Sequence, residues 1–115
     1  PAYGINSIDN ISICQGYQIK MIDTDTLILE GIAVQPENTN CHIPSSWSYI
    51  SYLRNTPASI VNMTSSISTN IEIVKNYFGQ IYWPVYNVNQ IGNMIPGQGY
   101  QIKMTNASTL TYPAN

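Results

Sequence analysis

The chain has 115 residues, of which 43% are hydrophobic and only 9% are charged, and its formal net charge at pH 7 is −2. This length suits one compact domain with a single modest core. So little charge excludes electrostatic capture of nucleic acid or of an anionic membrane, and so much apolar material excludes disorder. Forty residues are Ser, Thr, Asn or Gln. We therefore predict an exported wall, fibre or adhesion protein rather than a cytosolic enzyme, with no membrane insertion, because no apolar run reaches the ~20 residues of a span.

The first predicted elements form a hairpin. Eighteen isoleucines against four leucines favour strands, because β-branched side chains pack well on a pleated surface. Residues 16–21 alternate apolar and polar side chains, as a half-buried strand does. The turn at 23–25 leads into a second strand at 26–30.

The elements that follow are short. We predict a strand pair from 41–44 and 47–53, one helix near residues 57–68 that begins at the N-cap Thr56 and Pro57, and a hairpin from 71–75 and 80–83. A turn-rich segment over 85–99 leads into a final strand pair. The predicted fold class is α+β and β-rich, with mostly antiparallel short strands and hairpins in a tandem-repeat unit.

An internal repeat is the most specific signal in the sequence. The hexapeptide Gly-Tyr-Gln-Ile-Lys-Met at 16–21 recurs at 99–104, an offset of 83 that holds without a gap from Pro1 to Gly31, with 14 identities in 31 pairs. We therefore divide the chain into residues 1–31, the C-terminal part of a preceding repeat that duplicates 84–114, and residues 32–115, one complete unit. Two explanations stay open: a piece of a longer array, which the sequence favours, or a complete subunit that polymerises through the part-unit.

Several motifs together resemble a repeat of large secreted or surface-anchored proteins of flavobacteria and other Bacteroidetes. In chain order they are Trp-Ser-Tyr-Ile-Ser-Tyr-Leu-Arg at 47–54, Ile-Val-Lys-Asn at 73–76, Tyr-Trp-Pro at 82–84, Pro-Gly-Gln-Gly-Tyr-Gln-Ile-Lys at 96–103 and Leu-Thr-Tyr-Pro at 110–113. The resemblance implies export, tandem display at the cell surface or in an extracellular fibre, and no catalytic residues. In the leading part-unit, Ile13-Cys14 replaces the Pro-Gly that precedes Gln-Gly-Tyr.

The two cysteines, Cys14 and Cys41, are the disulfide candidate, because an even count suits an extracytoplasmic chain and neither has a second cysteine at metal-ligand spacing. Two buried free thiols are the alternative. We predict no metal, cofactor or catalytic group.

Aromatic residues are the candidates for an interface or a ligand site, since they bury much area and since sugars stack on their faces. These residues are Trp47, Tyr49, Tyr82, Trp83 and Tyr86. Thr26, in an Asp-Thr-Leu triplet that resembles an O-glycan acceptor of exported Bacteroidetes proteins, is the glycosylation candidate.

The sequence thus predicts a secreted or cell-surface module that is not an enzyme. Its role would be structural or adhesive, with units stacking or polymerising head to tail into a surface array or filament. Its partners would be copies of itself or neighbouring repeats, with glycans as a further class. The alternative is a carbohydrate-binding module within a large secreted surface protein.

Overall fold

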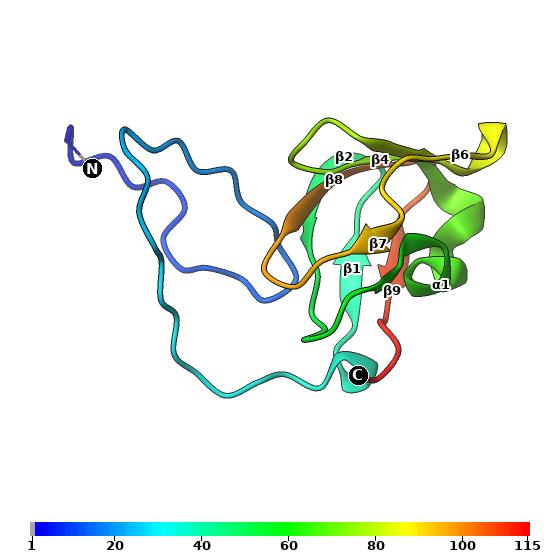
Figure 1. The fold of residues 1–115 in the computed structure, drawn as a ribbon, viewed down its shortest axis with the longest axis horizontal. Helices are drawn as coiled ribbons and strands as arrows, with labels where there is room; N and C mark the ends of the chain where they lie inside the picture. The colour runs from blue at the N-terminus through cyan, green and yellow to red at the C-terminus, as the bar shows by residue number, and fades with distance from the viewer. Residues whose placement is uncertain (1) are drawn as a thin grey trace.

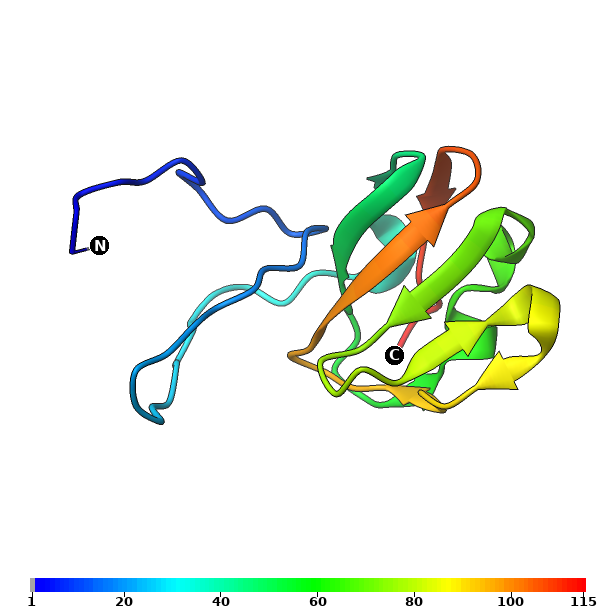
Figure 2. The same ribbon diagram turned by 90° about the horizontal axis from the view of Figure 1, so that it is seen from above.

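The structure, a computed structural model, describes residues 2–115 and has two parts (Figure 1). Residues 2–35, called the arm below, run away from the rest of the chain without forming a strand. Residues 36–115, called the body, contain the strands and the short helices. The arm contributes much of the longest dimension, and the molecule measures 43 × 28 × 25 Å. Figure 2 shows the same separation from above.

A five-stranded antiparallel sheet forms the centre of the body, in the order β2-β8-β4-β5-β6. Its strands are β2 (Ser46–Ser51), β4 (Ile71–Lys75), β5 (Ile81–Trp83), β6 (Val88–Asn89) and β8 (Gly99–Met104). The central strand β8 pairs with β2 on one side and with β4 on the other. Its side chains alternate in burial along the strand, which is why the period-2 pattern of the hexapeptide is so clear in the sequence.

Two small antiparallel pairs complete the body. One joins β1 (Cys41–Ile43) to β9 (Ser108–Leu110), and the other joins β3 (Ala58–Ser59) to β7 (Asn93–Met94). The helical turns are α1 (Ile60–Met63) and the 3-10 turns η1 (Pro36–Asn38), η2 (Ser65–Asn70) and η3 (Pro84–Tyr86). The predicted β-rich class with mostly antiparallel short strands is therefore confirmed, and the helical segments are only short turns.

All the side chains of the core cluster belong to the body. Fully buried members include Tyr100, Ile102 and Met104 from β8, Leu110 from β9 and Tyr112 from the segment after it. The disulfide-bonded Cys14 packs against this cluster from the arm. The second copy of the repeated sequence, residues 84–114, thus supplies a large part of the core.

The single helix predicted near 57–68 is divided in the structure. Residues 58–59 form β3, and only 60–63 are α-helical before the chain tightens into η2. The hydroxyl of Thr64 donates to the carbonyl oxygen of Ile60 at 2.7 Å, and Ser65 and Ser68 bond to carbonyls three residues back. Such side-chain bonds to the backbone compete with a regular helix.

Two predicted pairings are wrong. The strands near 41–44 and 47–53 exist but do not pair with each other, since β1 pairs with β9 and β2 with β8. For the same reason β8 and β9 do not pair as a final hairpin. The hairpin of 71–75 with 80–83 is correct, because β4 pairs with β5.

The hairpin predicted at 16–21 and 26–30 is also wrong. These residues are not strands, although the identical hexapeptide forms β8 further along the chain. In the body, β8 has hydrogen-bonding neighbours on both sides, whereas residues 17–30 of the arm have none. A strand requires such partners, so local sequence alone does not make one.

Candidate functional site

The arm exposes the same kinds of side chain that the second copy buries. Seven apolar residues between 84 and 114 belong to the core, and each is 9% exposed or less. All seven have apolar counterparts in the arm, 83 residues earlier. One counterpart, Tyr17, is half-buried, and the other six are 53–75% exposed. The arm residues are Ile8, Ile11, Tyr17, Ile19, Met21, Leu27 and Leu29, and the core residues are Ile91, Met94, Tyr100, Ile102, Met104, Leu110 and Tyr112.

The arm also keeps local geometry of the second copy. Gly4 has a left-handed φ of 65°, as its counterpart Asn87 has a φ of 54°. Asp9 has a φ of 60° and its N–H donates to the Asn6 side chain at 3.0 Å. Its counterpart Gly92 has a φ of 69° and donates to Asn89 at 2.9 Å.

The turn before the hexapeptide is repeated as well. The N–H of Ser12 donates to the hydroxyl oxygen of Tyr17 at 2.8 Å, and the N–H of Ile95 donates to Tyr100 at the same distance. Residues 2–31 of the arm are therefore a locally formed copy of residues 85–114 that lacks the strand partners of that segment.

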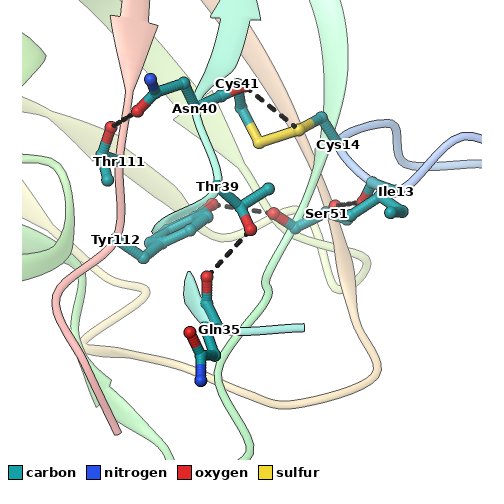
Figure 3. Close-up of a disulfide and its surroundings, with 9 residues drawn as sticks. All are labelled: Ile13, Cys14, Gln35, Thr39, Asn40, Cys41, Ser51, Thr111 and Tyr112. Atoms are coloured by element: carbon teal, nitrogen blue, oxygen red, sulfur yellow. Dashed lines mark hydrogen bonds between the residues drawn. A yellow bond between two sulfur atoms is a disulfide. The ribbon is translucent and has the colours of Figure 1, made fainter. Parts of the chain in front are cut away.

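A disulfide joins the arm to the body. Cys14 and Cys41 are bonded, with Cα atoms 5.4 Å apart and a sequence separation of 27, and both described cysteines are used (Figure 3). Cys41 is the first residue of β1 and is buried, whereas Cys14 is half-buried at the surface. The link attaches the turn before the arm hexapeptide to the edge of the body.

Hydrogen bonds to β2 reinforce this link. The N–H of Gly16 donates to the carbonyl oxygen of Tyr49 at 3.2 Å, and the N–H of Ser51 donates to that of Cys14 at 3.3 Å. The Ser51 hydroxyl donates to the Ile13 carbonyl oxygen (Figure 3). Residues 13–16 thus occupy part of the open edge of β2, whose other edge is paired with β8.

A glycine pair allows this close approach. A Cβ atom on Gly16 would lie 2.7 Å from the carbonyl oxygen of Ile50, and one on its counterpart Gly99 would lie 3.4 Å from the Cα atom of Gly16. The first distance leaves no room for a Cβ atom, so Gly16 is required here, whereas the second is an ordinary van der Waals contact. The starts of the two copies of the hexapeptide therefore lie in backbone contact.

Tyr112 supports the same junction from inside. Its hydroxyl donates to the carbonyl oxygen of Ser51 at 2.8 Å, and its ring lies edge-on to Tyr52 with centroids 5.5 Å apart. Burial raises the pKa of the Tyr112 phenol well above 10, and burial also raises the pKa of Tyr100, which a hydrogen bond from Ile95 partly offsets.

The predicted aromatic residues do not form one surface. Tyr82 is buried in the core, Tyr49 and Trp83 are half-buried, and Trp47 and Tyr86 are exposed. Trp83 and Tyr86 pack edge-on with centroids 4.6 Å apart.

Trp47 lies apart from that pair. The ammonium groups of Lys75 and Lys103 lie 5.3 and 5.9 Å from the centroid of its ring. Lys103 also forms an ion pair of 3.2 Å with Glu72. Its counterpart Lys20 has no such contact among the described ion pairs.

A shallow cavity of about 640 Å³ lies between the arm and the body. The aromatic residues in its wall are Tyr17 from the arm, and Tyr49 and Tyr77 from the body. Four amide side chains also line it, those of Gln18, Asn76, Gln98 and Gln101. Tyr49 is the one predicted ligand aromatic that contributes to this wall.

The remaining sequence candidates lie elsewhere. Thr26 is exposed on the arm, where its N–H donates to the Asp25 side chain at 2.7 Å. Within residues 2–115, no three His, Cys, Asp or Glu side chains gather where they could hold a metal ion, and no helix is long and apolar enough to cross a membrane.

Sequence reasoning missed the residues that build the junction. Gly16 carried a signal, because it is one of the identities in the repeat and a glycine in an expected strand marks close backbone contact. Ser51 and Tyr112 carried no such signal in the sequence, since their roles depend on tertiary neighbours.

Comparison with protein-family models, with curated proteins and with solved structures finds no match to this chain.

Proposed function

We propose that the protein is an extracellular structural or adhesive repeat module whose units associate head to tail into a surface array or filament. One observation carries the proposal: the arm exposes apolar residues to water at six positions whose counterparts form part of the core of the body. Burying one such side chain contributes about 1.5–3 kcal/mol. An exposed apolar segment of this kind marks a site of protein–protein contact.

Further support comes from charge and covalent structure. A formal net charge of −2 opposes assembly of identical units only weakly. The Cys14–Cys41 disulfide is compatible with an extracellular location. The motif resemblance to surface repeats of Bacteroidetes remains a prediction that points the same way, as does glycan attachment at Thr26.

Sedimentation velocity over a wide concentration range, together with electron microscopy, tests the proposal. The wild-type chain is compared with a variant that carries Ile19→Ser and Leu27→Ser in the arm. We expect concentration-dependent association of the wild type and its loss in the variant, whose body is unaltered. A wild-type chain that stays monomeric at every concentration would contradict assembly between separate chains.

Carbohydrate binding is the second candidate function, and the arm–body cavity favours it. Three tyrosines and four amide side chains provide stacking faces and paired donors and acceptors. Glycan-array binding that is lost in Tyr49→Ala and kept in Tyr86→Ala would support this function. Absence of binding to any glycan would remove it.

A further inference from the structure

We propose that the arm is the second half of another body and that its partner is a second copy of residues 32–83. In that complex, residues 16–21 form a central strand between the copies of β2 and β4, and residues 25–27 pair with the copy of β1. The inference rests on the proposed function, because it takes the arm as the element that assembles.

The body of this chain shows what such a complex looks like. Residues 84–114 supply β8 and β9, while residues 32–83 supply their partners β1, β2 and β4. Gly99 lies opposite Ser51, Tyr100 opposite Ile50 and Met104 opposite Ser46. With the offset of 83, the same register places Gly16, Tyr17 and Met21 opposite those three residues of the copy. Lys20 then faces the Glu72 of the copy, as Lys103 faces Glu72 here.

The arm cannot use the body of its own chain. The sites for a tyrosine, an isoleucine and a methionine are already filled by Tyr100, Ile102 and Met104, each at most 2% exposed. Exchange of one hexapeptide for an identical one would leave another apolar strand exposed, so it gains nothing. The favourable partner is therefore a copy of residues 32–83 whose strand site is vacant.

The covalent path permits this arrangement within one polypeptide. The two copies of the repeat begin at Pro1 and Pro84, and Trp83 precedes Pro84. A copy of residues 32–83 placed directly before Pro1 reproduces the Trp83–Pro84 junction of the body. Consecutive units of 83 residues then each form one complete body.

The hydrogen bonds at the junction are compatible with completion of the second body. The N–H of Ser51 donates to the carbonyl oxygen of Cys14 rather than to that of Gly99, so Ser51 and Gly99 form a non-hydrogen-bonded pair of the ladder. The backbone N–H of the glycine at this position faces away from its own β2 strand. Gly16 can therefore pair within one body and still donate to Tyr49 of the next.

The disulfide then links two consecutive bodies. Cys14 lies in the turn before the central strand of one body, and Cys41 lies in β1 of the next. The counterpart of Cys14 is Gly97, an exposed residue with a φ of 83°, so the described turn before β8 offers no cysteine to a further unit. Together with the Gly16–Gly99 contact, the disulfide fixes how one body sits on its neighbour.

The test is a tandem chain in which a second copy of residues 32–83 precedes residues 1–115. Amide hydrogen exchange is followed in fragments that span residues 12–24, because their flanks distinguish the two hexapeptides. We expect residues 17–21 to exchange quickly in the 115-residue chain at concentrations where it is monomeric, and at least about a hundredfold more slowly in the tandem chain, as residues in paired core strands do.

Two matched variants of the tandem chain complete the design. Ile19→Asp places a charge at a position equivalent to the buried Ile102, and we expect it to abolish the new protection while the second body stays folded. Ile22→Asp makes the same change at a position equivalent to the exposed Thr105, and we expect it to leave the protection intact.

Three results would overturn the inference. One is an arm that exchanges equally fast with and without the added copy, and a second is protection that survives Ile19→Asp. The third is protection of the arm in the monomeric 115-residue chain, at concentrations where sedimentation shows no association, because the arm would then be covered by its own body. Self-association of that chain is decided separately by sedimentation, so failure of the inference and failure of the proposed function can be told apart.

Discussion

Equivalent isoleucines in the two copies of the repeat give a direct test of how the chain uses identical sequence. Ile102 is fully buried in β8, whereas Ile19 is 75% exposed in the arm. Replacing Ile102 by alanine removes three carbons from a packed site, which costs about 0.8 kcal/mol for each carbon in transfer free energy. The cavity left behind raises the expected loss in the free energy of unfolding to about 3–4 kcal/mol.

Ile19→Ala is the matched variant, with the same atoms removed from the same local sequence. Because its side chain is solvated, we expect the free energy of unfolding to change by no more than about 0.5 kcal/mol. Urea unfolding followed by tryptophan fluorescence measures both, since Trp47 and Trp83 lie in the body. Equal losses for the two variants would refute the assignment of the first copy to an unpaired arm.

Three further predictions concern the junction and the core. Cys14→Ser opens a loop with a sequence separation of 27, worth about 3.5 kcal/mol in the chain-entropy picture. Most of that loop consists of arm residues 17–35, which form no strand in the folded state either. Urea unfolding should therefore show a loss under about 1 kcal/mol while limited proteolysis of the arm accelerates, and a loss of the full 3.5 kcal/mol or so would contradict this. Gly16→Ala places a Cβ 2.7 Å from the carbonyl oxygen of Ile50 and should release the arm, shifting the Ser51 amide resonance, whereas Gly31→Ala meets no atom within 4 Å and should not. The raised pKa of Tyr112 means that the unfolded chain loses this proton near pH 10 while the folded chain keeps it. The contribution of this phenol to the free energy of unfolding should therefore be constant below about pH 10 and should fall above it by up to ~1.4 kcal/mol per pH unit. The fall should be less steep in Tyr112→Phe, and a profile that stays flat above about pH 10 would contradict the burial argument.

Much of the candidate site follows from the repeat, and part of it does not. The offset of 83 pairs residues 2–31 of the arm with body residues, so a reader of the sequence could list Ile19 and Met21 as core-type positions. Their exposure could not be read, because burial depends on whether β2 and β4 are occupied. The contact of Ser51 with Ile13 could not be predicted either, because the residues next to Ser51 in the sequence do not indicate a partner 38 residues away.

The wrong predictions of strand pairing have the same physical cause. Alternation located β2, β4, β5 and β8 within a few residues, because a half-buried strand has a period of two whatever its partner. The choice of partner is non-local: β1 joins β9 across most of the body, and β8 separates β2 from β4. Only packing of the whole core selects among such pairings.

By itself, the sequence determined the repeat, the β-rich class, the turn positions and the chemical alternation of each strand, all of which depend on neighbouring residues. Tertiary structure decided which copy becomes a strand. Gly-Tyr-Gln-Ile-Lys-Met is β8 at 99–104 and an unpaired segment at 16–21, although the letters and the preceding turn are shared. The reason is that a strand satisfies its backbone hydrogen bonds on other strands, and those neighbours exist around the second copy alone in the part of the chain that the structure describes.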